Sequence, residues 1–443
     1  MTGGRTIGSV AVIGAGTMGL GIAALCADLD VPVLLLDRAG QGDHNGPAKT
    51  ALERIPSLRP AAMKNPDKAR LIAIGNVEDD LARIAGHDWV CEAVFEDLAL
   101  KRALMAEIEA ARRAGSIVTT NTSGIPLRAI AEGMPERLRR DLAVTHFFNP
   151  VNVMRLCEIV PGPNTAADVV PTLEAFIGGR LGKGIVHAKD TVNFIANRIG
   201  CFFMLSGLHH AMAALDEGAD VEAVDAALGA PVGLPSTGLY GLIDLIGLDV
   251  MDLVAKNLAA NLPAGDAGRA FLAFPAPVQA MLERGQIGRK AGAGFYRMVK
   301  TADGGRAREV WDVRTGAWRP ERRPELATEE WSAALLDAPT PQGRLAWRAM
   351  GGTLAYAAGL VPGIADDIVN VDRAMRWGYG WAKGPFEMLD LLDAPAFARR
   401  LAAEGRPMPN MLGVLARAGR TRFYDGDGCF LGTDGTLRPL ACT

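Results

Sequence analysis

The feature that most constrains the fold is a short apolar run, Val10–Ile13, followed at once by a glycine-rich turn and an Ala- and Leu-rich segment. In the order strand, Gly-x-Gly-x-x-Gly, helix, this is the pattern of a dinucleotide-binding βαβ unit. The glycines permit a tight turn, a close approach to a pyrophosphate and close helix–strand packing, and the helix N-terminus favours phosphate. The residues predicted to line the nucleotide site are Gly14, Gly16, Thr17, Met18 and Gly19.

The second predicted strand ends in an acid, Asp37. A carboxylate at this position can accept both ribose hydroxyls and would repel a 2′-phosphate, so NAD is favoured over NADP. Arg38 weakens this preference, because an arginine beside that position can help to hold a 2′-phosphate. The alternative is a glycine turn that only packs a helix on a strand, but strand, helix and terminal acid together favour the nucleotide.

Up to about residue 185, short β-branched runs alternate with helical patterns, which indicates a parallel, doubly wound sheet. The predicted strands are Val10–Ile13, Val33–Leu36, Trp89–Ala93, Ile117–Thr120, Ala143–His146 and Leu156–Val160. From about Asp190 helical periodicity takes over, with a second helical region from about Gln342 to Ala416. The predicted fold class is α/β, a Rossmann-type doubly wound parallel sheet followed by two all-α helical domains.

The two helical regions resemble each other, which indicates a two-copy internal duplication rather than a solenoid of three or more units. Val224–Leu228 leads to Leu242–Ile246 in the first copy, and Val371–Met375 leads to Met388–Leu392 in the second. A hairpin is expected around Thr315–Gly316. The predicted domains are 1–188 for the nucleotide, 189–298 and 336–443 for the helical copies, and 299–335 for a linker or surface ribbon.

Composition narrows the classes of partner. The chain is 49% hydrophobic and 22% charged, as in an ordinary globular protein, and its net charge of −3 gives no sign of a nucleic-acid or membrane partner. Its scattered cysteines form no disulfide or metal-ligand pattern, so we expect a cytoplasmic protein without a metal site. We see no signal peptide, and the apolar stretch Phe194–Leu215 carries polar residues, so we expect a buried helix. The cysteines are Cys26, Cys91, Cys157, Cys201, Cys429 and Cys442.

Among the six histidines, His146 stands apart because it ends a hydrophobic strand. In open α/β sheets ligands bind beyond the carboxyl ends of the strands, and an imidazole can accept a hydroxyl proton near neutral pH. Glu158 lies in the next strand-like run, where a buried acid needs a partner. Adjacent strands would bring the two together, and the carboxylate would fix the tautomer and stabilise the imidazolium.

Two further polar residues are candidates for positioning a substrate's oxygen atoms. Ser123 follows the strand Ile117–Thr120, and Asn197 opens the first long helix of the second domain. A hydroxyl and an amide can both donate to such oxygens. The alternatives stay open, because Ser123 could instead cap a helix and Asn197 could make an ordinary interdomain hydrogen bond.

In combination these motifs closely resemble the 3-hydroxyacyl-CoA dehydrogenases. The matching segments, spread over residues 10–296 in the family's order, are Gly14–Gly19, Cys91–Asp97, Asn121–Ser123, His146–Pro150, Met154–Val160, Lys189–Thr191, Phe194–Arg198, Gly288–Lys290 and Gly294–Tyr296. The resemblance implies NAD-dependent oxidation of L-3-hydroxyacyl-CoA to 3-ketoacyl-CoA. It implies that His146 is the base, that Glu158 is its partner, and that Ser123 and Asn197 surround the substrate oxygen. The NAD contacts that it implies, beside Asp37, are Glu96, Lys101, Ser123, Asn149 and Lys290.

Several alternatives accompany this resemblance. Lys101 and Lys290 could be solvated surface charges, and Lys64 and Lys68 are candidates for binding the anionic CoA or for ordinary surface charge. Another two-domain hydroxyacid dehydrogenase is disfavoured because such enzymes rely on a lysine base. A catalytically silent NAD- or acyl-CoA-binding module is disfavoured by the intact pair of His146 and Glu158.

The duplicated helical domain is similar to that of multifunctional fatty-acid oxidation proteins. The second copy keeps the segment Gly384–Glu387 of that pattern, whereas the first has Thr237–Gly241. In those relatives an enoyl-CoA hydratase domain follows, whereas this sequence ends at Thr443 with no room for one. We therefore predict no hydratase activity and expect either a fragment or a chain that lost this domain. Because the second copy could cover the usual dimer surface, we expect a monomer with an internal pseudo-dimer, with a homodimer as the alternative.

Overall fold

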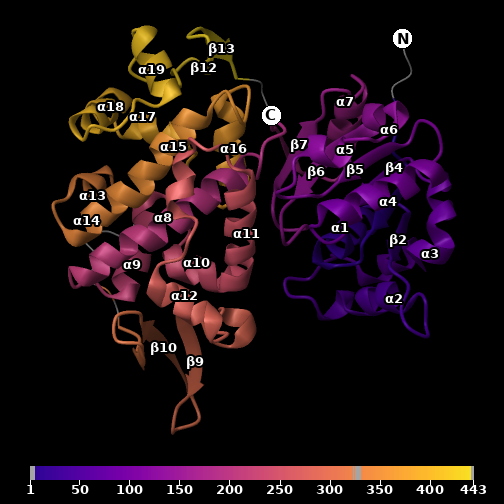
Figure 1. Ribbon diagram of the computed structural model, residues 1–443, viewed down its shortest axis with the longest axis horizontal. Helices are drawn as coiled ribbons and strands as arrows, with labels where there is room; N and C mark the ends of the chain where they lie inside the picture. Colours follow the sequence, from indigo (N-terminus) through magenta and orange to yellow (C-terminus); the bar gives the residue numbers. More distant parts are fainter. Residues whose placement is uncertain (1–4, 323, 325–330, 441–443) are drawn as a thin grey trace. The chain divides into compact units, whose positions relative to one another are not determined.

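The computed structural model describes residues 5–322, 324 and 331–440, so that Cys442 lies outside the described residues. The chain divides into two compact units (Figure 1). The first comprises the chain up to Ile195 together with Ile364–Asp366, and the second comprises the remainder.

The first unit is built on an eight-stranded sheet with the strand order β3-β2-β1-β4-β5-β6-β7-β8. The strands are β1 (Val10–Ile13), β2 (Val33–Asp37), β3 (Ile72–Asn76), β4 (Trp89–Glu92), β5 (Ile117–Thr120), β6 (Leu142–Phe147), β7 (Leu156–Pro161) and β8 (Gly184–His187). All six predicted strands are present, and β3 and β8 are additional. The predicted fold class of a Rossmann-type sheet followed by helices is confirmed.

One pairing in this sheet differs from the expected parallel arrangement. Strands β6 and β7 are antiparallel, while every other neighbouring pair is parallel. The reason is the short connection 148–155, because a parallel neighbour needs a crossover of a dozen or more residues. The consequence is that residues of the two strands lie directly opposite each other, including His146 and Glu158.

Helices cover the sheet of the first unit (Figure 1). They are α1 (Thr17–Asp28), α2 (Gly46–Glu53), α3 (Val77–Asp80), α4 (Leu98–Ala111), α5 (Leu127–Ala131), α6 (Glu136–Asp141) and α7 (Val169–Leu173). The apolar helix α1 joins a core that includes Phe147 and Cys157. Because successive strand residues point to opposite faces, the intervening His146 and Glu158 point away from this core.

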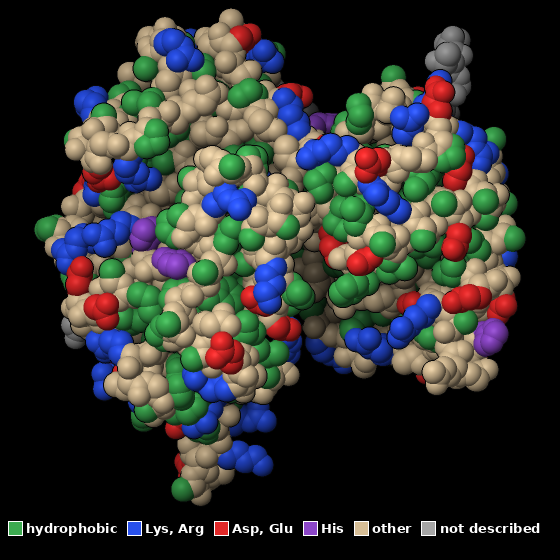
Figure 2. All heavy atoms as spheres, viewed as in Figure 1, with side chains coloured by type: hydrophobic (Ala, Val, Ile, Leu, Met, Phe, Trp, Pro, Cys, Tyr) green, Lys and Arg blue, Asp and Glu red, His purple; other side chains and the backbone are tan. Residues whose placement is uncertain are grey.

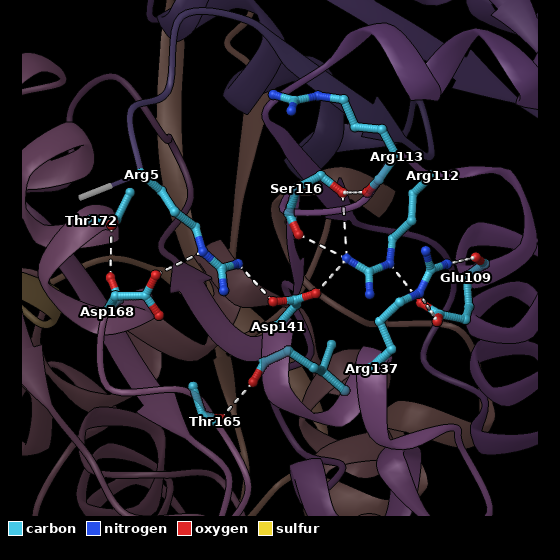
Figure 3. Close-up of polar contacts among 11 residues, drawn as sticks. Arg5, Glu109, Arg112, Arg113, Ser116, Arg137, Asp141, Thr165, Asp168 and Thr172 are labelled. Carbon is cyan, nitrogen blue, oxygen red and sulfur yellow. Dashed lines mark hydrogen bonds and ion pairs between the residues drawn. The ribbon is translucent and has the colours of Figure 1, made fainter. Parts of the chain in front are cut away.

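A buried ion network ties the first unit together at the amino ends of its parallel strands (Figure 3). The Arg112 side chain is fully buried and pairs with Glu109 (2.6 Å) and Asp141 (2.8 Å). Asp141 also pairs with Arg5 (2.7 Å), and Glu109 pairs with Arg137 (2.6 Å). The network therefore joins segments that precede β1, β5 and β6, at the edge of the sheet opposite to His146.

The second unit is mainly helical. Its helices are α8 (Ala196–Asp216), α9 (Val221–Ala227), α10 (Gly238–Ile246), α11 (Leu248–Asn261), α12 (Ala276–Glu283), α13 (Ala333–Asp337), α14 (Pro341–Ala346), α15 (Gly352–Leu360), α16 (Ile368–Gly378), α17 (Pro385–Leu391), α18 (Ala394–Ala403) and α19 (Asn410–Arg417). Within the described residues, α8 alone is long and apolar enough to cross a membrane, yet 67% of its most apolar window is buried in the protein.

Two small antiparallel sheets complete the second unit. One contains β9 (Tyr296–Lys300), β10 (Arg306–Asp312) and β11 (Ala317–Pro320), and the other contains β12 (Cys429–Leu431) and β13 (Leu437–Pro439). The turn between β10 and β11 includes Thr315 and Gly316, where a hairpin was expected. The predicted linker thus carries a β-ribbon, while the exact domain boundaries stay a prediction.

The two helical copies share one arrangement of polar groups. In the first copy Asp225 accepts the backbone N–H groups of Tyr240 and Gly241, at the start of α10, and the hydroxyl of Tyr296. In the second copy the donors to Asp372 are Phe386 N–H, Glu387 N–H and the Tyr424 hydroxyl. In each copy, therefore, a buried aspartate joins the start of a helix to a tyrosine that is distant in the sequence, as an internal duplication predicts.

Candidate functional site

The glycine turn after β1 has the shape that a dinucleotide requires. Gly14 has a φ of +106°, and an added Cβ there would lie 2.6 Å from the carbonyl oxygen of Ala93. At Gly19 a Cβ would lie 1.8 Å from the carbonyl oxygen of Gly14, whereas at Gly16 it would meet no atom within 4 Å. Gly14 and Gly19 are therefore required by packing, and the open space beside Gly16 fits a pyrophosphate that approaches the backbone.

Asp37 lies beside this turn, at the carboxyl end of β2. One carboxylate oxygen accepts the backbone N–H of Ala15 (2.7 Å), and the other accepts that of Arg38 (2.7 Å). The carboxylate thus stands where the ribose of a dinucleotide follows the pyrophosphate. The Arg38 side chain is exposed. The glycines, the helix N-terminus and this acid together fit NAD.

His146 and Glu158 form a buried hydrogen-bonded pair on neighbouring strands. The His146 Nδ1 atom lies 2.7 Å from Glu158 Oε2, and the side chains are 5% and 0% exposed. With the carboxylate accepting from Nδ1–H, the other ring nitrogen, Nε2, presents its lone pair as a base. Phe148 and Phe194 pack against the imidazole, with ring centroids 4.4 and 5.7 Å away. The pairing proposed from the sequence is present in the structure.

An unusual backbone turn completes the surroundings of Glu158. Asn193 and Phe194 have φ values of +60° and +48°, a left-handed conformation that non-glycine residues adopt only at an energetic cost. This turn directs the backbone N–H of Ile195 onto Glu158 Oε1 (3.1 Å). The carboxylate is therefore held at both oxygens, which fixes the orientation of the imidazole. Sequence reasoning missed this donor because a backbone N–H leaves no trace in residue identity.

Ser123 and Glu96 lie together after β5 and β4. Glu96 Oε1 accepts the hydroxyl of Thr122 (2.6 Å) and the backbone N–H groups of Ser123 and Gly124 (both 2.9 Å). Burial opposes ionisation of Glu96, but Lys101 and these hydrogen bonds together hold its pKa below its usual value. Ser123 does not cap a helix, because α5 begins after Pro126. The alternative that the Ser123 side chain caps a helix is therefore wrong.

Lys101 is not a solvated surface charge. Its side chain is 1% exposed and its ammonium lies 2.8 Å from Glu92 and 3.4 Å from Glu96. Glu92, at the end of β4, is fully buried and also accepts the hydroxyl of Thr120. Sequence reasoning did not assign a role to Glu92, although an acid that ends an apolar strand was a signal. Asn149 lies exposed after β6.

The remaining predicted site residues belong to the second unit. Asn197 lies in the first turn of α8, where its Oδ1 accepts the hydroxyl of Tyr379 (3.0 Å). Lys290 pairs with Asp249 of α11 (2.7 Å). The first unit thus brings Asp37 to the glycine turn, Glu96 to Lys101 and Ser123, and His146 to Glu158, and it also carries Asn149, whereas Asn197 and Lys290 lie in the helical unit. No cluster of His, Cys, Asp or Glu in the described parts of the chain could hold a metal ion.

An open, mostly parallel sheet with this glycine turn and an acid after its second strand defines the dinucleotide-binding domain of a dehydrogenase. Residues 9–191 match the family model of the 3-hydroxyacyl-CoA dehydrogenase NAD binding domain, and residues 194–298 match that of the C-terminal domain. A probable 3-hydroxyacyl-CoA dehydrogenase of Deinococcus radiodurans is 35% identical over 349 residues, covering 78% of this chain and 98% of that protein. The chain belongs to the 3-hydroxyacyl-CoA dehydrogenase family, and its cofactor is NAD.

Two further comparisons extend over almost the whole chain. A probable 3-hydroxyacyl-CoA dehydrogenase of Bacillus subtilis is 35% identical over 445 residues, covering 95% of this chain and 55% of that protein. The crystal structure of 3-hydroxybutyryl-CoA dehydrogenase from Escherichia coli K12 is 25% identical with a TM-score of 0.68, covering 93% of this chain and 98% of that one. The chain spans only about half the length of the Bacillus subtilis relative.

Proposed function

We propose that the chain oxidises L-3-hydroxyacyl-CoA to 3-ketoacyl-CoA with reduction of NAD, as a step of fatty-acid β-oxidation. The observation that carries this proposal is the buried pair of His146 and Glu158, at the carboxyl edge of a sheet whose glycine turn fits NAD. A base held by a carboxylate is suited to removing a proton from an alcohol. Family membership and the match to the E. coli enzyme structure support the substrate class.

In the proposed mechanism, His146 Nε2 accepts the proton of the substrate's 3-hydroxyl as the C–O bond gains carbonyl character. Bound NAD supplies the hydride-accepting chemistry for the hydrogen on C3. The Glu158 carboxylate, on the far side of the ring, stabilises the imidazolium that results. Burial of the pair excludes water and preserves the strength of this interaction.

The other site residues are assigned positioning roles. Ser123 and Asn197 donate to the substrate's oxygen atoms, and Glu96, Lys101, Asn149 and Lys290 contact NAD together with Asp37. Lys101 and Lys290 already have carboxylate partners, and these ion pairs limit how either lysine can act on NAD. Lys101 then acts mainly by orienting Glu96, and Lys290 must exchange Asp249 for the cofactor.

The test is NADH formation by the purified chain, with NAD and L-3-hydroxyacyl-CoAs of short and long acyl chains. His146→Gln should lower turnover by about 10²–10⁴-fold while NADH binding is retained, because only the proton acceptor is removed. His44→Gln, the same change at an exposed histidine of the same unit, is the matched control and should leave turnover unchanged. An absence of turnover in protein that binds NADH would instead support a silent binding module.

We also propose that the chain is a cytoplasmic monomer with an internal pseudo-dimer. The support is the repeated polar arrangement around Asp225 and Asp372, together with the finding that no disulfide bond joins the described cysteines. Light scattering coupled to size-exclusion chromatography tests the oligomeric state, and a mass of twice the chain would establish the homodimer instead.

A further inference from the structure

A cavity of about 930 Å³ lies wholly within the helical unit, and none of the site residues assigned above lines it. Its walls come from both helical copies. Phe202 and His210 of α8 and the segment Ala267–Phe271 form one side. The other side is formed by residues of α14, of the π-helical segment Trp347–Gly351, of α15 and of α18 and the turn that follows it. Its volume is in the range of sites for small organic ligands, about 300–1,000 Å³.

The lining of this cavity is strongly cationic. Four arginines line it, and Glu404 is the one acid among the described residues that do so. Glu404 is shared, since it accepts the indole N–H of Trp347 (2.7 Å) and lies 3.4 Å from Arg400 and 3.7 Å from Arg406. The arginines are Arg344, Arg348, Arg400 and Arg406.

One of these arginines has no compensating charge. Arg344 pairs with Glu217 and Arg400 pairs with Asp337, whereas exposed Arg348 has no ion-pair partner in the described part of the chain. Guanidinium groups present planar forks of donors that match phosphate oxygens. The cavity therefore offers Arg348 to an anion, together with Arg406, whose contact with Glu404 is long at 3.7 Å. Figure 2 shows blue basic and purple histidine side chains gathered on this unit.

His210 reports the electrostatic state of the cavity. Burial, followed by the nearby charges of Arg348, His209 and Arg406, lowers its pKa to about 4. The imidazole is therefore neutral at pH 7 within a positive environment. An anion bound between the arginines would reverse the sign of the local potential and favour the imidazolium.

The floor of the cavity is aromatic. Phe202 stacks on Tyr356, with ring centroids 4.0 Å apart, and meets the edge of Phe271 at 5.7 Å. Phe271 also contacts the His210 ring at 5.4 Å, and Trp347 carries Arg400 over its face at 3.6 Å. Flat apolar surfaces of this kind accept the face or edge of another planar ring. A ligand that joins phosphate to a flat ring would use both halves of the lining.

We propose that this cavity binds a small organic phosphate that carries a flat aromatic ring, the chemistry of an adenine nucleotide. The phosphates contact Arg348 and Arg406, and the ring lies against Phe202 and Phe271. The proposal is independent of the dehydrogenase reaction, because no residue of the cavity belongs to the catalytic or NAD site. It assigns a second ligand to the duplicated helical domain, in a space that only the presence of both copies creates.

The test uses ADP as the probe and the histidine ring protons of the full chain as the readout. Only six histidines are present, and a His210→Gln variant identifies the His210 signal. We expect ADP to shift this signal and to raise the pKa of His210. Arg348→Ala and Arg406→Ala should each weaken ADP binding by roughly 10–100-fold, the usual effect of a lost charge-assisted hydrogen bond.

Arg417→Ala is the matched control, an exposed arginine on α19 that does not line the cavity, and it should leave ADP binding unchanged. All variants should keep the circular dichroism spectrum and the NADH affinity of the parent chain. Binding of ADP without a change at His210, or equal affinity in the Arg348 and Arg406 variants, would overturn the proposal. Inorganic phosphate that binds as tightly as ADP would overturn the part assigned to the aromatic floor.

Discussion

Replacing Arg112 by Met removes the central cation of the buried network in Figure 3 while keeping a long apolar side chain. Two carboxylates, Glu109 and Asp141, then lose a fully buried partner, and the carbonyl of Ser116 loses a 2.8 Å hydrogen bond. Removing one member of a buried ion pair costs about 3–5 kcal/mol, because the remaining charge is left desolvated.

The structure places the expected cost at the lower end of that range. Glu109 keeps Arg137 at 2.6 Å and Asp141 keeps Arg5 at 2.7 Å, so neither carboxylate is left unpaired. In addition, Nη2 of Arg112 is buried without a hydrogen-bond partner, and its removal relieves that penalty. We expect a loss of about 3 kcal/mol, which lowers the melting temperature of a unit of this size by roughly 6–12 °C.

Calorimetry of the full chain measures this loss. The transition that NADH raises belongs to the first unit, because a ligand stabilises only the folded form that binds it. Arg137→Met is the matched control, since its side chain is 48% exposed and water screens its pair with Glu109, so the expected cost is only about 1 kcal/mol. Equal melting temperatures for the two variants would refute the argument that burial, rather than the number of ion pairs, sets the cost.

Four further outcomes are expected. Glu158→Gln should lower kcat by about 10²–10⁴-fold with unchanged NADH affinity, and a parent-like kcat would contradict its role. Gly16→Ala should weaken NADH binding at unchanged melting temperature, because its Cβ meets no protein atom, whereas Gly19→Ala should fail to fold stably, since its Cβ would lie 1.8 Å from a carbonyl oxygen. Asp37→Ser should shift the ratio of NAD to NADP turnover towards NADP by roughly 10–100-fold, and an unchanged ratio would rule out a ribose contact. Burial raises the pKa of Asp372 to about 8, so the stability that its protonated form contributes is present below its ordinary pKa and is lost as pH rises through 8. The melting temperature of the helical unit should therefore fall between acidic and alkaline pH, and less steeply in Asp372→Asn.

Much of the nucleotide site was predictable because its signals are local. The glycine turn and the acid that ends β2 depend on residues whose spacing along the chain fixes their roles. His146 and Glu158 were also predictable, since each is a polar residue within an apolar strand. Their pairing followed from the short connection between the strands, although the antiparallel direction that this connection requires was not drawn from it.

What the sequence did not predict depends on distant segments. The strand β3 ends in Gly75 and Asn76, and β8 has only Ile185 and Val186 between Gly184 and His187, so neither forms a long apolar run and their place in the sheet comes from their neighbours. The ion network around Arg112 joins residues from Arg5 to Asp168, and no local sequence pattern predicts contacts between such distant residues. The Ile195 N–H that holds Glu158 depends on a left-handed turn at two non-glycine residues, a conformation that local propensity disfavours.

The antiparallel pairing of β6 and β7 also determines how the pair of His146 and Glu158 is assembled. Because His146 and Glu158 face each other across one hairpin, the pair is encoded within thirteen consecutive residues, His146–Glu158, and can assemble as soon as that hairpin closes. A register slip by a single residue would turn one partner to the opposite face of the sheet. The length of the connection 148–155 therefore sets whether the base meets its carboxylate, and an insertion or deletion of one residue there should separate the two side chains.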